Sequence, residues 1–244
     1  MRIAHALATA GLGSRRKCEV LVTNGAVTVN GEVVQDLGRQ VDLTKDTIAY
    51  RGKVLEAAPD VYYIMNKPEG YVVTAQDAHA KKTVYDLLPR QLVNSTRQGG
   101  RGRVRVFPVG RLDKDSMGIL LLTNDGELSH RLLHPRYHVE KWYEVILDRA
   151  WRPEDALRVL KGFHAFDGLL KLEQIRPISR RHVLVQLREG KKRQIRRVFS
   201  KFGYKVVTLI RISFGPIKVE GLRLGEGRYL TTFEAKTLRK AAGL

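Results

Sequence analysis

The chain has 244 residues and a single cysteine, Cys18, which excludes an intramolecular disulfide and a zinc site built from cysteines. No apolar stretch of about 18 residues is present and the first residues lack a signal-peptide pattern, so we expect a soluble, cytoplasmic protein with no membrane partner. The 44 Lys and Arg outnumber the 25 Asp and Glu, and the net charge of +19 favours a polyanionic partner such as nucleic acid.

The N-terminal segment predicts a small module of two helices followed by a hairpin. Residues 2–10 place their apolar side chains on one helical face, and Ser14 is a suitable N-cap for a second helix. Asn30-Gly31 between alternating valines is a strong hairpin signal. The stretch 56–60 contains a proline and has no periodicity, so we expect the linker there.

Three cations, Arg15, Arg16 and Lys17, occupy the first turn of the second predicted helix. Cations at this end oppose the helix dipole by up to about 1 kcal/mol each at the surface. A phosphate seated against the helix start would use both the charges and the free amides, whereas a solvated charged turn is the alternative. We predict that these residues bind RNA.

The stretch 91–105 is polar and rich in glycine and arginine. A P-loop is excluded because no Lys followed by Ser or Thr comes after the glycines. A flexible basic loop that settles on RNA is the preferred interpretation, and simple disorder is the alternative.

The sequence FPVGRLDKDSMGILLLTNDGEL at residues 107–128 is the most informative part of the chain. An apolar lead-in meets a polar turn, and the apolar run 119–122 that follows is typical of a buried strand. A charged loop between two buried elements is a common place for chemistry, so Asp113 is the candidate, although a turn aspartate explains it equally well. Asp115 and Asp125 are rival carboxylates, which we interpret as turn residues.

His130, His134 and His138 are spaced by four residues, which would bring them together on a helix. Pro135 interrupts that helix, and no cysteine or paired acidic residue completes a ligand set. We therefore predict no metal site.

Later segments predict further strands and helices. Residues 140–147 alternate as a strand with Tyr143 on the same face as Lys141 and Val145, and a core tyrosine is the simplest explanation. Residues 182–187 and 206–212 also predict strands.

Helices are predicted after Pro153, with Leu157 and Leu160 inward, and after Thr231, where Glu234 completes a capping box. The mixture of strands and helices without regular alternation favours an α+β fold with a largely antiparallel sheet. The predicted domains cover residues 1–58 and 61–244.

Positive charge is concentrated late in the chain. Residues 176–218 contain 13 Lys and Arg against one acidic residue, Glu189, a net charge of +12. Within it, residues 192–202 predict an amphipathic helix whose cations lie off the apolar stripe. The cations that we predict to bind RNA here are Lys192, Arg193, Arg197 and Lys201.

GRLDKDSMGILLLTNDGEL resembles the signature of bacterial ribosomal-RNA pseudouridine synthases of the RsuA/RluB type. The segments YYIMNKPEGYVVT, HPRYHVEKWYEV, EGKKRQIRRVF and LIRISFGPI follow the order of that family. The N-terminal segment resembles the small RNA-binding domain first known from a small-subunit ribosomal protein. The resemblance implies a curved mixed sheet with the active cleft across it, and it covers nearly the whole chain.

The resemblance also implies an activity, the isomerisation of uridine to pseudouridine without a cofactor. By position in the motifs, Asp113 is the catalytic aspartate, Tyr143 stacks on the base, and Arg196 pairs with Asp113. Arg111 binds substrate and Leu209 packs under the base. We expect a monomer whose partner is ribosomal RNA, with large-subunit RNA favoured over small-subunit RNA. The RNA could be bound either naked or within an assembling ribosomal particle.

Two other classes of protein compete with this interpretation. A non-catalytic RNA-binding or ribosome-assembly protein would explain the charge and the N-terminal module, but not Asp113 accompanied by Tyr143 and Arg196. A methyltransferase would need a cofactor loop or a nucleophilic cysteine, and a deaminase would need a Cys/His zinc set. Neither pattern occurs in the sequence.

Overall fold

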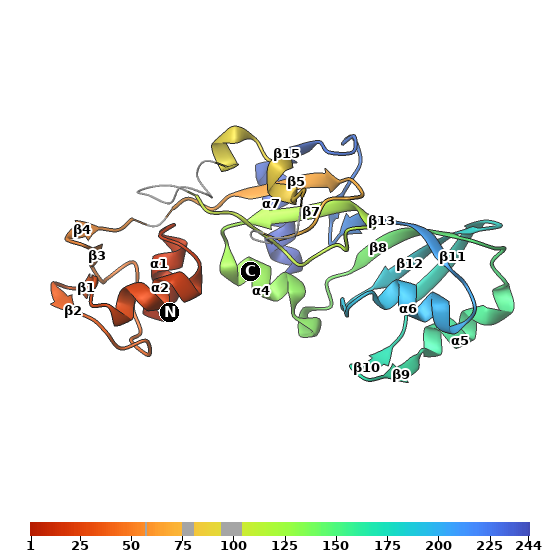
Figure 1. The fold of residues 1–244 in the computed structure, drawn as a ribbon, viewed down its shortest axis with the longest axis horizontal. Coiled ribbons are helices and arrows are strands. Elements are labelled where there is room, and N and C mark those ends of the chain that lie inside the picture. Colours follow the sequence, from red (N-terminus) through yellow and green to blue (C-terminus); the bar gives the residue numbers. More distant parts are fainter. Residues whose placement is uncertain (57, 75–80, 94–103) are drawn as a thin grey trace. The chain divides into compact units, whose positions relative to one another are not determined.

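The structure is a computed structural model that describes residues 1–56, 58–74, 81–93 and 104–244 (Figure 1). The chain forms two compact units. The first contains Met1–Val61, Leu88–Phe107 and Thr123–Gly126, and the second contains Tyr62–Leu87, Pro108–Leu122 and Glu127–Leu244. Because two later segments belong to the first unit, the division into domains 1–58 and 61–244 stays a prediction. The expectations for the basic loop concern mainly residues 94–103, which lie outside the described residues.

The first unit contains the predicted helices α1 (Ile3–Thr9) and α2 (Arg15–Thr23). The Ser14 hydroxyl accepts a hydrogen bond from the Lys17 amide at 3.2 Å, which confirms the predicted N-cap. The predicted hairpin is also present, with Asn30 and Gly31 at positive φ in its turn.

Two further strands that the sequence did not reveal complete a four-stranded sheet in this unit. Its order is β2 (Glu32–Val33), β1 (Val27–Val29), β3 (Ile48–Tyr50) and β4 (Lys53–Val54). Ile3 and Leu7 of α1, Cys18 and Val22 of α2, and Ile48 of β3 are buried in its core. The lone cysteine is therefore a core residue, and burial raises the pKa of its thiol to about 11.

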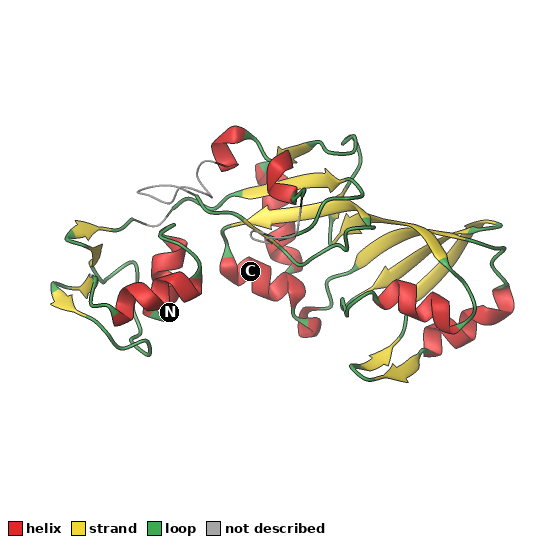
Figure 2. Cartoon of the chain, viewed as in Figure 1, coloured by secondary structure: helices red, strands yellow, loops and turns green. Residues whose placement is uncertain are grey.

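The second unit is built on a nine-stranded sheet (Figure 2). In sheet order the main strands are β11 (Gln174–Ser179), β12 (His182–Leu187), β8 (Lys141–Leu147), β13 (Val206–Phe214), β7 (Met117–Thr123), β5 (Tyr62–Lys67) and β15 (Gly227–Tyr229). The short strands β6 (Phe107–Pro108) and β14 (Ile217–Lys218) pair with β7 and β13.

The pairing of β13 with β7 is parallel, whereas β11 with β12, β12 with β8, β8 with β13 and β5 with β15 are antiparallel. This mixed, largely antiparallel sheet confirms the predicted fold class. Residues 119–122 are almost completely buried because β7 is a central strand with core on both faces.

Helices α4 (Gly126–Leu133) and α7 (Thr232–Ala241) cover the part of the sheet around β7 and β5. Leu128 and Leu132 of α4 pack with Leu238 of α7 against Ile119 and Leu121. The predicted capping box of Thr231 and Glu234 is present at the start of α7. None of the helices in the described part of the chain is both long enough and apolar enough to cross a membrane.

Helices α6 (Gln194–Lys201) and α5 (Ala156–Lys161) lie beneath strands β8, β12 and β11 (Figure 1). Further elements are the hairpin β9 (Phe163–Ala165) and β10 (Gly168–Leu170) and the 3-10 turns η1 (Val84–Leu87), η2 (Pro135–Tyr137) and η3 (Pro153–Asp155).

The predicted inner face of the helix after Pro153 is wrong at Leu157, whereas Leu160 is half-buried. Leu157 is 81% exposed, and the buried positions are Asp155 and Val159. The helical segment begins with the 3-10 turn η3. Asp155 can be buried there because Tyr204 and two arginines donate hydrogen bonds to its carboxylate. Residues i and i+4 share a helical face, so Val159 turns inward with Asp155 and Leu157 turns out.

Candidate active site

The loop 110–116, between β6 and β7, carries Asp113. Its anchor is Lys67, the fully buried last residue of β5. The Lys67 ammonium donates to the carbonyl oxygens of Asp113 at 3.1 Å and Ser116 at 2.7 Å. The Ser116 amide also donates to the Asp113 carbonyl, at 3.1 Å. The loop backbone is thus fixed, while the Asp113 side chain stays 37% exposed.

Burial lowers the pKa of Lys67 to about 8, and the nearby carboxylates of Asp115, Asp113 and Glu69 oppose this shift. A buried ammonium is tolerated only where it is well hydrogen-bonded, and the loop carbonyls satisfy that requirement. The sequence interpretation missed Lys67. The only signal was a lysine at the end of an apolar strand run.

A cavity of about 580 Å³ brings together four of the five residues predicted to act on the substrate. Asp113 and Arg111 reach it from the loop, and Tyr143 and Leu209 reach it from the neighbouring strands β8 and β13. The side chains of Tyr143 and Leu209 are both buried, at 7% and 6% exposure. An aromatic ring and an apolar side chain therefore form walls near a partly exposed carboxylate.

Arg196, the fifth predicted residue, does not pair with Asp113. Its guanidinium donates to the carbonyl oxygens of Val206 and Asp115, both at 2.8 Å, and lies 3.2 Å from the Asp115 carboxylate. These two carbonyls fix the guanidinium away from Asp113. The cation beside Asp113 is instead Arg193, whose Nη1 lies 3.8 Å from Asp113 Oδ2.

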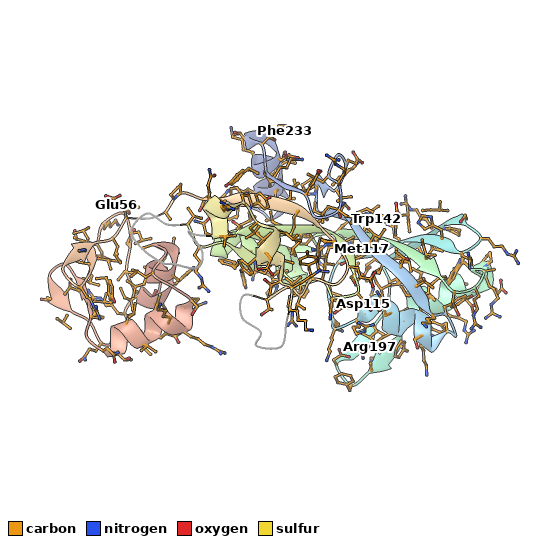
Figure 3. The ribbon with its side chains drawn as sticks, turned by 45° about the horizontal axis from the view of Figure 1, so that its top comes forward. Glu56, Asp115, Met117, Trp142, Arg197 and Phe233 are labelled. Atoms are coloured by element: carbon orange, nitrogen blue, oxygen red, sulfur yellow. The ribbon has the colours of Figure 1, made fainter. Side chains whose placement is uncertain are left out.

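Asp115 is more than a turn residue, because it ties two arginines together. Arg193 donates to both of its carboxylate oxygens at 3.1 Å, in addition to the contact with Arg196. Burial raises the pKa of Asp115, but the hydrogen bond from Arg193 and the charge of Arg196 outweigh burial, and the net shift is downward. In Figure 3, Asp115 lies next to the helix that carries Arg197.

Two buried cations, Lys141 and Arg211, also line the cavity. The Lys141 ammonium donates to the Val139 carbonyl at 3.2 Å, and Arg211 Nε donates to the Ile119 carbonyl at 2.8 Å. Burial, followed by the charge of Arg211, lowers the pKa of Lys141 to about 8, and Glu189 opposes the shift. The alternation of β8 placed Lys141 on the face of Tyr143, a signal that could have identified it.

The predicted RNA-binding residues of the second unit lie around two hollows. Lys192 and Arg193 line the cavity of Asp113, and Arg193 also lines a neighbouring groove of about 1210 Å³ with Arg197 and Lys201. Arg197 is held by a bidentate ion pair with Asp167, both contacts at 2.8 Å. In the first unit, Arg15, Arg16 and Lys17 are exposed at the start of α2.

The three spaced histidines do not form a common ligand set. The rings of His130 and His134 lie 5.4 Å apart, but His134 caps η2 through a hydrogen bond from the Arg136 amide. Within the described ranges, no three His, Cys, Asp or Glu side chains gather as metal ligands would.

Residues 61–201 match a protein family described as RNA pseudouridylate synthase, and residues 1–48 match the S4 domain. The ribosomal large subunit pseudouridine synthase B of Bacillus subtilis is 36% identical over 99% of this chain and 96% of its own length. An uncharacterized RNA pseudouridine synthase of Aquifex aeolicus is 37% identical over 100% of this chain and 96% of its own.

A relative from Pseudomonas aeruginosa, also a ribosomal large subunit pseudouridine synthase B, is 36% identical over the whole chain, which spans 63% of that protein. Among solved structures, a crystal structure of a pseudouridylate synthase superposes with a TM-score of 0.68 at 28% identity, covering 98% of this chain and 99% of the other. Sequence and fold therefore agree over nearly the full length.

Proposed function

The chain belongs to the RNA pseudouridylate synthase family, and from this we propose that it converts a specific uridine of ribosomal RNA, preferentially of the large subunit, into pseudouridine at Asp113. The names of the relatives from Bacillus subtilis and Pseudomonas aeruginosa support the large-subunit preference. The observation that carries the assignment of the site is the partly exposed Asp113 carboxylate in a cavity walled by Tyr143 and Leu209.

The reaction breaks the bond between C1′ of the ribose and N1 of uracil and forms a bond between C1′ and C5. One proton leaves C5 and one is gained at N1, so the product is an isomer and no cofactor is required. The Asp113 carboxylate acts at the nucleoside. The Tyr143 ring and the Leu209 side chain hold the detached base between them while it turns.

Arg193 and Arg196 divide the role that the sequence assigned to Arg196 alone. Arg193 is the cation beside the Asp113 carboxylate, at 3.8 Å, so its positive charge lies next to the reacting group. Arg196 acts as a positioning residue, because it holds Asp115, which in turn holds Arg193. Lys67 positions the same loop, because its ammonium donates to the carbonyl oxygens of Asp113 and Ser116.

A uridine within folded RNA must be flipped out of its stack to reach Asp113, at a cost of a few kcal/mol. Phosphate contacts can offset that cost. The exposed cations of α2 and the cations around the groove beside Asp113 are the groups that we propose for these contacts. Arg111 lines the cavity itself and contacts the flipped nucleotide.

The decisive variant is Asp113→Asn, which keeps the shape of the side chain and removes its negative charge. We expect the variant to fold and to bind RNA as well as the parent, but to form pseudouridine at least about 1000-fold more slowly, since the reacting carboxylate is gone. Pseudouridine mapping in ribosomal RNA from cells that carry only the variant checks this result and identifies the modified subunit.

The matched control is Asp36→Asn, an exposed aspartate of the first unit whose carboxylate accepts from its own loop at Gly38. It should leave the rate unchanged. Normal pseudouridine formation by Asp113→Asn would refute the role of Asp113. Absence of pseudouridine formation by the parent as well would instead favour a non-catalytic RNA-binding protein.

A further inference from the structure

Phe166 stands at the tip of the β9–β10 hairpin and is 93% exposed, more than any other large apolar side chain in the described part of the chain. A single exposed apolar residue is ordinary on a protein surface. Phe166 differs because the structure holds its hairpin firmly and surrounds it with cations.

Several contacts hold the hairpin to α6 and to the segment before it. The Arg197 guanidinium donates to both carboxylate oxygens of Asp167, the neighbour of Phe166, at 2.8 Å. The same guanidinium lies 5.0 Å from the centroid of the Phe166 ring. The Lys191 ammonium donates to the Leu169 carbonyl at 2.7 Å, which fixes the returning strand.

The residues that hold the hairpin also line the cavity of Asp113 or the neighbouring groove. Lys191 lines the cavity, while Arg197 and Phe163 line the groove, and Arg193 lines both. The groove has six cationic and three acidic lining residues, which favours a polyanion. Its cations are Arg149, Arg193, Arg196, Arg197, Lys201 and Lys205.

We propose that the Phe166 ring stacks on an unpaired RNA base next to the target uridine while the adjacent groove carries the phosphates of the same strand. The inference rests on the proposed function, because it needs an RNA whose uridine enters the cavity of Asp113. Flipping a uridine out of its stack leaves neighbouring bases without a stacking partner. An exposed aromatic ring provides one, and it accepts every base because each base has a flat π face.

The fixed hairpin makes this stacking efficient. A ring on a mobile loop would lose conformational freedom on binding, whereas the hairpin of Phe166 is already held by the Arg197–Asp167 ion pair and by Lys191. The Arg197 guanidinium lies beside the ring and also lines the groove, so one residue links the stacking contact with the groove.

The test compares Phe166→Ala, Phe166→Tyr and Phe233→Ala. Phe233, on α7, is also strongly exposed, at 77%, and lies on a distant part of the second unit from Arg197 (Figure 3). The probes are a fluorescein-labelled oligouridylate of about 12 nucleotides and an abasic oligonucleotide of the same length and charge. Affinity is measured by fluorescence anisotropy at fixed salt, since salt changes the electrostatic contribution.

We expect Phe166→Ala to weaken oligouridylate binding about tenfold. Phe166→Tyr and Phe233→Ala should bind like the parent, and the abasic probe should bind all four proteins equally. Unchanged oligouridylate affinity of Phe166→Ala, or an equal loss with the abasic probe, would overturn the stacking contact.

Pseudouridine formation by the parent on ribosomal RNA is measured in the same series. An inactive parent whose oligouridylate binding still depends on Phe166 would refute the proposed function and support the stacking contact. An active parent whose affinity does not depend on Phe166 would overturn the stacking contact alone.

Discussion

The two units of the protein use their cations in different ways. In the first unit, Arg15, Arg16 and Lys17 are exposed at the start of a short helix. In the second unit, Arg193 and Arg197 are joined to the carboxylates of Asp115 and Asp167. An exposed, mobile cation attracts phosphate from any direction, whereas a paired arginine has a fixed direction but a reduced net charge.

This difference predicts that the first unit contributes mainly affinity for RNA, whereas the ion pairs of the second unit fix the positions of the groups around Asp113. Long exposed side chains lose rotamer freedom when they bind, so their main contribution is a salt-dependent attraction. Arginines held by carboxylates and carbonyls have already lost that freedom and can position a reacting group. We therefore expect changes in the first unit to affect RNA affinity and changes in the ion pairs of the second unit to affect the rate.

The largest effect among the tests of this comparison is expected for Asp115→Asn. The change removes the charge that holds Arg193 and Arg196, so the cation beside Asp113 loses its fixed position. We expect the single-turnover rate of pseudouridine formation to fall about 100-fold, because misplaced catalytic groups carry a penalty of this size. RNA affinity should change only about twofold.

Asp148→Asn is the matched control, because Asp148 also pairs with an arginine, Arg149, at 3.3 Å. That ion pair does not include Arg193 or Arg196, so the control should keep the rate of the parent. A rate loss of equal size in both variants would show that the paired carboxylates of this region act on folding rather than on the position of Arg193.

The second test concerns the buried Lys141, whose pKa is lowered from 10.5 to about 8. Between about pH 8 and 10.5 the unfolded state binds more protons than the folded state, so this lysine makes stability rise with pH across that window. Lys141→Met should remove the rise and raise the free energy of unfolding at pH 7 by on the order of 1–3 kcal/mol.

Urea unfolding at pH 7 and at pH 9.5 measures the effect. Lys67, with a similarly lowered pKa, keeps part of the pH dependence in the variant. Lys240→Met, at the exposed end of α7, is the control and should leave the pH dependence as it is in the parent. Lower stability of Lys141→Met at pH 7 would mean that the hydrogen bonds of Lys141 outweigh the cost of its burial.

The smallest effect is expected in the first unit. Replacing Arg15, Arg16 and Lys17 together by alanine should weaken the binding of structured ribosomal RNA about tenfold and lower the slope of log affinity against log salt by up to about 3. The single-turnover rate at saturating protein should stay unchanged. A rate loss that saturating protein does not rescue would contradict the separation of affinity from geometry.

The local elements of this protein could be predicted from the sequence. The Ser14 cap, the Asn30-Gly31 turn, the buried run at 119–122 and the Thr231 capping box depend on neighbours within a few residues, and the structure confirms each of them. The helix after Pro153 was the exception, because the burial of Asp155 depends on Tyr204, which is 49 residues further along the chain.

The candidate site was only partly predictable for the same reason. The sequence determined which residue types are present around Asp113, and it placed Tyr143 and Lys141 on one strand face. Which arginine meets which aspartate was decided by the tertiary structure, since Arg193 and Asp115 are 78 residues apart and their contact depends on how α6 and the loop before β7 are positioned. Side-chain periodicity reports the direction of a residue within its own element, whereas the partner of a charge depends on the packing of several elements.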